Sequence, residues 1–387
     1  MKKGICLWVI ICIGLWAAGC TGLRQDAKET VLTYTFEEPG RYRYAYHQLS
    51  EREQKWYEQM NEALGRMLEK QELSPQGLIP GEEQKTFDKI FQCVMDDHPE
   101  YFYADGYTCS FLCRQNQTVK VEFTANYSMD IREAEEKEKQ IAKQADLWLS
   151  GLSENADEYE RVKYVYETII RNTEYDRQAP DNQNIYSVFL RKRSVCQGYA
   201  KAAQYLLNRL GIESMLVTGT VTGGESHAWN LVKMDGEYYY LDVTWGDASF
   251  RRKEADLAKA ENDFFYQKSV SYEYLGLTSE EFGKTHFPES VVPLPECTAV
   301  ADNYYVREGT YFTEFKEGEL KEQCKRALSG EKKEFSFKCS SLEVFEQIRS
   351  CLLKDQTIFD WLSEIPKETD HMAYSIEEDL LTMRIWV

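Results

Sequence analysis

Apolar residues recur at helical spacing through much of the first half of the chain. This periodicity predicts helices at about Glu51 to Lys70, Glu82 to Met95, Ile131 to Leu149 and Asn155 to Asn172. Alternation of apolar and polar residues predicts strands at Val31 to Phe36, Tyr101 to Leu112 and Val119 to Tyr127. Residues 31–150 are therefore expected to form an α+β accessory region, and they contain no visible chemistry.

The middle of the chain combines one apolar helix with three strands. The helix is expected to begin at Cys196 and to end near Leu210, because Gly211 favours a helix stop. Turn residues then separate three predicted strands, at Met215 to Thr222, His227 to Met234 and Glu237 to Trp245.

The turn between the last two strands predicts their register. Asp235-Gly236 is a strong signal for a two-residue hairpin loop, so Met234 should face Glu237. Counting back places Trp229 opposite Asp242 and His227 opposite Thr244. His227 and Asp242 then become diagonal neighbours on one sheet face, and a slip of one residue would separate them.

The last part of the chain alternates strands and helices. We expect strands within Asn303 to Phe315, a helix to Leu328, a strand at Glu334 to Lys338, and a terminal strand pair. Ser340 and Glu343 have capping-box spacing before a helix that starts at Leu342. A Pro-bearing stretch ends the central region, which gives a core at 151–295 and a C-terminal accessory domain at 296–387.

The first residues have the pattern of an export signal. Lys2 and Lys3 precede an apolar run that is too short for a membrane span, so residues 1–19 are predicted to be a signal peptide. Ala17-Ala18-Gly19-Cys20 resembles the lipobox of bacterial lipoproteins. This resemblance implies that Cys20 is lipidated, that residues 20–30 form a tether, and that the protein is anchored to the membrane outside the cytoplasm. The alternative is a plain secretory signal.

Composition narrows the choice of partners. A hydrophobic content of 43% suffices for a buried core, while the net charge of -19 disfavours nucleic acid as a partner. Among the 11 cysteines, Cys6, Cys12, Cys20 and Cys196 have other assignments, and the remaining seven leave at least one unpaired. No cysteine set has the spacing of a zinc site, so no metal is expected.

Cys196 is the strongest candidate for chemistry. A cysteine at a helix N-terminus is favoured as a thiolate by free N–H groups and the helix dipole, whereas an isolated cysteine on a helix is more often inert. His227 would act as the base, and Asp242 would orient the imidazole. The Cys196 backbone N–H and a side chain such as Tyr175 would stabilise the oxyanion. Further pocket candidates are Gln197, Trp229 and Trp245, although tryptophans on strands are more often core.

Three short motifs carry a resemblance to a known family. Cys-Gln-Gly-Tyr-Ala at 196–200, Ser-His-Ala-Trp-Asn at 226–230 and Tyr-Leu-Asp-Val-Thr-Trp at 240–245 resemble the bacterial transglutaminase-like core over about residues 155–250. The resemblance implies an α+β, papain-like fold, in which a helix bearing the cysteine packs on an antiparallel sheet bearing His227 and Asp242. It also implies amide or peptide chemistry without a cofactor.

Two functions remain open from the sequence. The first is a surface-tethered cysteine enzyme that transfers or hydrolyses acyl groups of proteins or peptides, with cell-wall peptides among the candidate substrates. A papain-type peptidase is a variant of it, although such enzymes bring an asparagine as third member and a glutamine ahead of the cysteine. The second function is a non-catalytic binding or assembly module of the same fold. His286 has no role assigned from the sequence.

Overall fold

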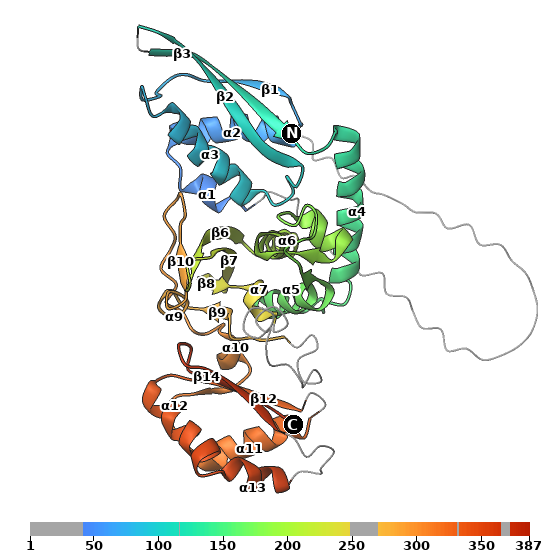
Figure 1. The fold of residues 1–387 in the computed structure, drawn as a ribbon, viewed down its shortest axis with the longest axis vertical. Coiled ribbons are helices and arrows are strands. Elements are labelled where there is room, and N and C mark those ends of the chain that lie inside the picture. Colours follow the sequence, from blue (N-terminus) through green and yellow to red (C-terminus); the bar gives the residue numbers. More distant parts are fainter. Residues whose placement is uncertain (1–41, 116, 248–269, 331–332, 365–371) are drawn as a thin grey trace, which may run out of the picture. The chain divides into compact units, whose positions relative to one another are not determined.

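A computed structural model describes residues 42–115, 117–247, 270–330, 333–364 and 372–387 (Figure 1). The predicted signal peptide, Cys20, the tether and the predicted strand at Val31 to Phe36 lie outside the described residues. Among the residues that are described, we find no helix with the length and apolar character that a membrane crossing requires.

The first described region is a small sheet with helices beside it (Figure 1). Its strands are antiparallel in the order β1-β3-β2. Its elements are α1 (Tyr44–His47), α2 (Glu51–Gly65), β1 (Lys70–Leu73), α3 (Glu83–Asp97), β2 (Ala104–Arg114) and β3 (Gln117–Tyr127). The predicted second helix and the two strands are present with shifts of up to three residues, but the first helix ends at Gly65, because Lys70 begins the strand β1, which was not predicted. The apolar face of α2 is buried as expected, through Trp56, Met60 and Leu64.

A buried carboxylate ties the three helices of this region together. Asp97, the last residue of α3, accepts hydrogen bonds from the backbone N–H groups of Ala45 and Tyr46 and from the hydroxyl of Tyr57. The distances are all 2.9 Å. These bonds satisfy N–H groups at the start of α1, which its N-cap residue leaves without a side-chain partner.

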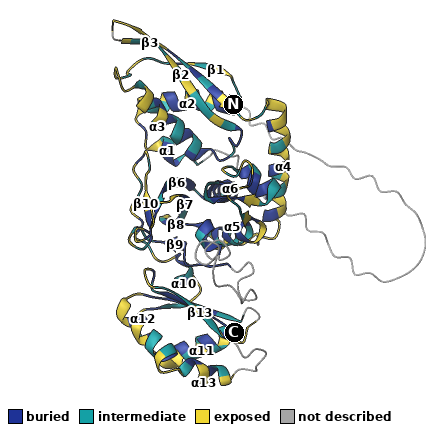
Figure 2. Ribbon diagram, in the orientation of Figure 1, coloured by how far each residue is buried: buried dark blue, intermediate teal, exposed yellow. Residues whose placement is uncertain are grey.

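The central region packs helix α6 against an antiparallel sheet. The sheet order is β10-β6-β7-β8-β9. Figure 2 shows α6 largely in the buried colour, and Gly198 through Asn208 are all buried. The elements are α4 (Ile131–Leu149), α5 (Glu158–Asn172), β4 (Glu174–Tyr175), the π-helical turn η1 (Ser187–Arg191), β5 (Arg193–Ser194), α6 (Cys196–Arg209), β6 (Ser214–Val221), β7 (Ser226–Met234), β8 (Glu237–Leu241), α7 (Val243–Gly246), β9 (Leu275–Leu277), α9 (Ser279–Phe282) and β10 (His286–Pro288).

The hairpin between β7 and β8 has the predicted register but not the predicted length. Met234 pairs with Glu237, and the ladder runs back to Asn230 opposite Leu241. The expected strand to Trp245 is wrong, because β8 ends at Leu241 and Asp242 caps the short helix α7. Thr244 therefore does not face His227 across a ladder.

The C-terminal region has a hydrophobic core of its own. Four strands in the order β11-β12-β14-β13 pack with helices around residues such as Leu320, Phe337 and Ile348. The elements are α10 (Tyr304–Arg307), β11 (Tyr311–Phe312), α11 (Glu317–Leu328), β12 (Glu334–Cys339), α12 (Leu342–Arg349), η3 (Ser350–Lys354), α13 (Thr357–Ser363), β13 (Ala373–Glu377) and β14 (Thr382–Trp386).

Two local predictions in this region are corrected. Residues Asn303 to Phe315 were expected as strands, yet Asn303 caps the helix α10 through the backbone N–H of Tyr305 and only β11 is a strand. The cap of α12 is Ser341, which accepts from the backbone N–H of Val344, and not Ser340. The domain boundaries as such stay a prediction.

Candidate active site

Cys196 is the first residue of α6, and the sequence around it keeps that helix end accessible. The N-cap residue Val195 offers no side-chain cap, so the free N–H groups of the first turn can act on the cysteine sulfur or on a ligand. Gly198 allows two other segments of the same chain to pack closely against α6. A Cβ at this position would lie 1.9 Å from Ser194 Oγ and 2.9 Å from the Asn182 carbonyl oxygen. Cys196 itself is half-buried.

His227 and Asp242 meet at the end of the hairpin. The Nε2 of His227, on β7, lies 2.7 Å from the Oδ2 of Asp242, and both side chains are buried. The other carboxylate oxygen accepts the backbone N–H groups of Thr244 and Trp245 at 2.8 and 3.0 Å. The pairing predicted from the register is thus present, although Asp242 reaches it as a helix cap.

The imidazole of His227 lies between Asp242 and Cys196. Because Nε2 is bonded to Asp242, Nδ1 is the nitrogen left for the Cys196 thiol, which is close enough to affect the pKa of the ring. Burial alone lowers the pKa of His227, but attraction to Asp242 and the hydrogen bonds to Asp242 and Cys196 outweigh it and raise the pKa to about 10. The same attraction overcomes the burial of Asp242 and holds its pKa well below the usual range. This arrangement favours a positively charged imidazole.

His286 is a member of the cluster that sequence reasoning missed. Its Nε2 lies 3.1 Å from the same Oδ2 of Asp242, and its Nδ1 lies 2.8 Å from the hydroxyl of Thr285. Burial lowers the pKa of His286, so we assign a neutral ring that donates to Asp242 and accepts from Thr285. His286 reaches Asp242 because β10 pairs with β6, and no local sequence pattern predicts that pairing.

The same three side chains are also the strongest candidates for a metal. The potential ligand atoms of His227, Asp242 and His286 lie within 4.8 Å of one another. Two imidazoles and a carboxylate are a common ligand type for divalent metals. In the described structure, however, both imidazoles hydrogen-bond to the carboxylate, an arrangement that already satisfies its charge.

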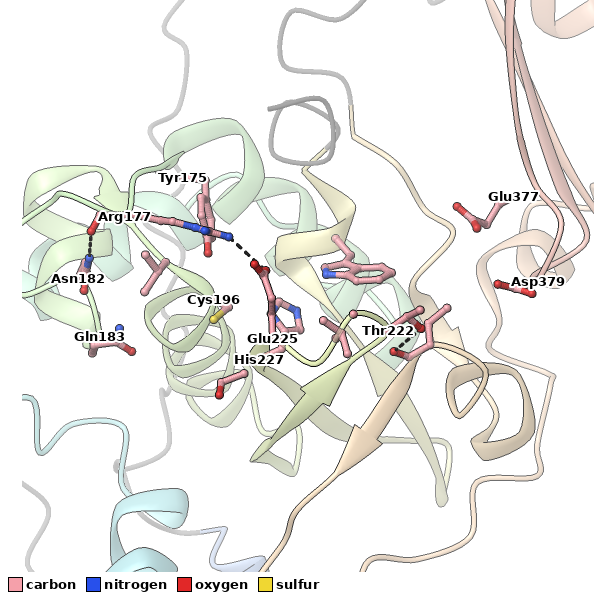
Figure 3. A pocket seen from close by; sticks show the side chains of 16 residues that line it. Tyr175, Arg177, Asn182, Gln183, Cys196, Thr222, Glu225, His227, Glu377 and Asp379 are labelled. Atoms are coloured by element: carbon pink, nitrogen blue, oxygen red, sulfur yellow. Dashed lines mark hydrogen bonds and ion pairs between the residues drawn. The ribbon is translucent and has the colours of Figure 1, made fainter. Parts of the chain in front are cut away.

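Cys196 and His227 open onto a cavity of about 920 Å³, which we call the Cys196 pocket (Figure 3). Two of the four predicted pocket residues, Tyr175 and Trp245, line it. The other two do not: Trp229 is fully buried against Phe282, and Gln197 faces a separate cavity. The remaining lining residues are Arg177, Asn182, Gln183, Val195, Val221, Thr222, Gly223, Glu225, Ser226, Thr285, Glu377 and Asp379.

The cysteines themselves differ in accessibility. All eight described cysteines are free thiols. Cys196 is half-buried and Cys113 is exposed. Cys109 is half-buried in the accessory sheet, and the remaining five are buried: Cys93, Cys297, Cys324, Cys339 and Cys351.

The fold and this site define an α+β protein in which a helix bearing a cysteine packs on an antiparallel sheet bearing a histidine, with a carboxylate at the sheet's end. Residues 148–243 match the family described as the transglutaminase-like superfamily. The family match therefore covers the part of the chain that carries Cys196, His227 and Asp242.

Individual relatives are distant. The kyphoscoliosis peptidases of Mus musculus and Homo sapiens are 24% and 25% identical over 155 residues, and the match covers 36% of this chain. The chain spans only 22% of the length of these relatives. A crystal structure of a TGase is similar at 16% identity and a TM-score of 0.27, covering 41% of this chain and 47% of that one. The periplasmic domain of TgpA from Pseudomonas aeruginosa is similar at 16% identity and a TM-score of 0.23, covering 36% and 58%.

Proposed function

We propose that this protein is a transglutaminase-like cysteine enzyme that transfers or hydrolyses acyl groups at amide bonds of proteins or peptides. The observation that carries the proposal is the convergence of Cys196, His227 and Asp242 at the Cys196 pocket. The lipobox-like sequence at Cys20 adds the proposal that a lipid anchor holds the enzyme on the membrane, outside the cytoplasm.

In the proposed reaction, each group has one task. The thiolate of Cys196 attacks the carbonyl carbon of the amide, and His227 gives its proton to the leaving amine. The acyl group then rests on sulfur until water or a second amine, activated by His227, takes it away. Asp242 keeps the ring oriented and stabilises its charge. His286 acts as a positioning residue, because its hydrogen bond to Asp242 fixes the carboxylate that in turn orients His227.

The start of α6 supplies the electrostatic support. The backbone N–H of Cys196 is placed to stabilise the negative oxygen of the tetrahedral intermediate, and the positive end of the helix dipole adds to it. Tyr175 lines the same pocket and stays a candidate for a second donor. Trp245 packs near His227, with ring centroids 6.0 Å apart, and shields one side of the imidazole.

Thiol reactivity tests the proposal, because Cys113 provides an internal reference. In a chain that begins at residue 24, treated with iodoacetamide at neutral pH, half-buried Cys196 should be alkylated faster than exposed Cys113, as peptide mass spectrometry would measure. His227→Ala should remove this preference. His47→Ala, at an exposed position away from the Cys196 pocket, serves as the control and should keep it.

The same experiment separates the enzyme from the alternative of a non-catalytic binding module. A module that only keeps the fold has no need for an activated thiol. Labelling of Cys113 at the same rate as Cys196, or a rate at Cys196 that His227→Ala leaves unchanged, would contradict the enzymatic proposal.

A further inference from the structure

A second cavity lies on the other side of the α6 start. It measures about 540 Å³ and is lined by residues from α3, β2, the loop at 181–184 and α6; we call it the α6 pocket. Asn182 and Gln183 line both this pocket and the Cys196 pocket, and Figure 3 shows them beside Cys196 on the side away from Glu377 and Asp379. Successive residues of α6 serve different pockets, since Cys196 lines one and Gln197 the other.

Two buried groups of opposite charge line the α6 pocket. Lys201 and Asp96 are each only 6% exposed. Lys201 lies one helical turn after Gln197, so both side chains share the face of α6 that lines the cavity. Asp96 belongs to the last turn of α3, where the helix dipole adds further negative charge.

The two groups attract each other without forming an ion pair. Each is within electrostatic range of the other, yet the described residues show no hydrogen bond or ion pair at the Lys201 ammonium. One oxygen of Asp96 accepts a hydrogen bond from Gln92 at 2.7 Å. Most of the Lys201 side chain is buried and the residue lines the cavity, so its ammonium is available to an acceptor inside the pocket.

The acidic groups of the pocket differ in how far they are already used. Asp181 forms an ion pair with Arg191 at 2.7 Å. Asp105 is exposed and lines the same cavity. A ligand entering the pocket thus meets one buried cation and two carboxylates, Asp96 and Asp105.

We propose that the α6 pocket binds a short unblocked peptide or amino acid, whose carboxylate pairs with Lys201 and whose ammonium pairs with Asp96 and Asp105. A ligand that carries both charges satisfies the two buried groups together, where a simple anion or cation would satisfy one. The volume is in the range of small-molecule sites. Through Asn182 and Gln183, a peptide held here continues toward Cys196; this last step rests on the proposed function, whereas binding itself does not.

Binding is tested in a Cys196→Ala protein of otherwise full sequence, so that no chemistry interferes. Isothermal titration with the dipeptide Ala-Ala should show saturable binding, and the N-acetylated and C-amidated dipeptides should each bind at least tenfold more weakly. Lys201→Met should abolish the preference for a free carboxylate, and Lys143→Met, at an exposed position of α4, should leave binding unchanged.

A milder variant covers the case in which Lys201→Met fails to fold. Asp105→Asn changes an exposed residue, and it should weaken Ala-Ala binding severalfold while leaving the N-acetylated dipeptide unaffected. Absence of saturable Ala-Ala binding, or equal binding of all three dipeptides, would overturn the inference. Since the thiol is absent throughout, this result is independent of whether Cys196 proves reactive in the labelling experiment.

Discussion

Two buried carboxylates flank the same helix and behave in opposite ways. Asp242, beside the Cys196 pocket, receives hydrogen bonds from two imidazoles and two backbone N–H groups, and its pKa is held far below the usual range despite burial. Asp96, on the other side, accepts one side-chain hydrogen bond from Gln92, and burial raises its pKa to about 7. Both carboxylates are buried, so the difference comes from their partners: attraction to His227 and the hydrogen bonds from the two imidazoles outweigh burial at Asp242, whereas burial dominates at Asp96.

The difference matches the work proposed for each site. A fully satisfied carboxylate keeps its position and charge while His227 exchanges protons, as preorganised catalysis requires. A carboxylate with spare bonding capacity is suited to meeting a ligand. Substitutions at the two positions should therefore have opposite effects on stability.

The largest effect is expected at Asp242. Asp242→Ala removes the partner of a buried, charged imidazole, so the free energy of unfolding should fall by about 3–5 kcal/mol at pH 8, measured by urea denaturation. Asp242→Asn should be milder by about 1 kcal/mol, because asparagine can still cap α7. A loss below about 1 kcal/mol for the alanine variant would show that the pair is not formed as described.

The opposite sign is expected at Asp96. Its folded pKa of about 7 exceeds the ordinary value of 3.8, so ionisation destabilises the fold as pH rises from about 4 to 7. Asp96→Asn removes this loss and should raise the free energy of unfolding at pH 8 on the order of a few kcal/mol, with little difference at pH 4. Urea denaturation at both pH values measures it, with Asp105→Asn as the exposed control. A destabilised Asp96→Asn protein at pH 8 would refute the comparison.

A smaller effect is expected at His286. His286→Ala takes one donor from a buried charge, which should cost about 1.5–3 kcal/mol of stability and slow the alkylation of Cys196 about tenfold. His286→Gln should restore most of the stability and most of the alkylation rate, because the Nε2–H of the glutamine can donate to Asp242. If both variants label at the wild-type rate, His286 has a packing role alone.

Much of the fold could be predicted because its signals are local. The bounds of α4 follow from the periodicity of its apolar residues, and the register of β7 with β8 follows from the Asp-Gly turn. Two predicted strands were wrong because a local side-chain hydrogen bond favoured a helix start instead. The side chain of Asp242 accepted two backbone N–H groups and ended β8. The side chain of Asn303 accepted the backbone N–H of Tyr305 and began α10 where a strand was expected.

The sequence by itself determined that Cys196 begins a helix and that His227 and Asp242 can meet, because both follow from hydrogen bonds between residues near each other along the chain. Only the tertiary structure decided that His286 shares Asp242, that Trp229 is core while Trp245 lines the pocket, and that Lys201 faces Asp96. The physical reason is that these contacts depend on how separate elements pack, and a one-dimensional pattern carries no record of which faces come together.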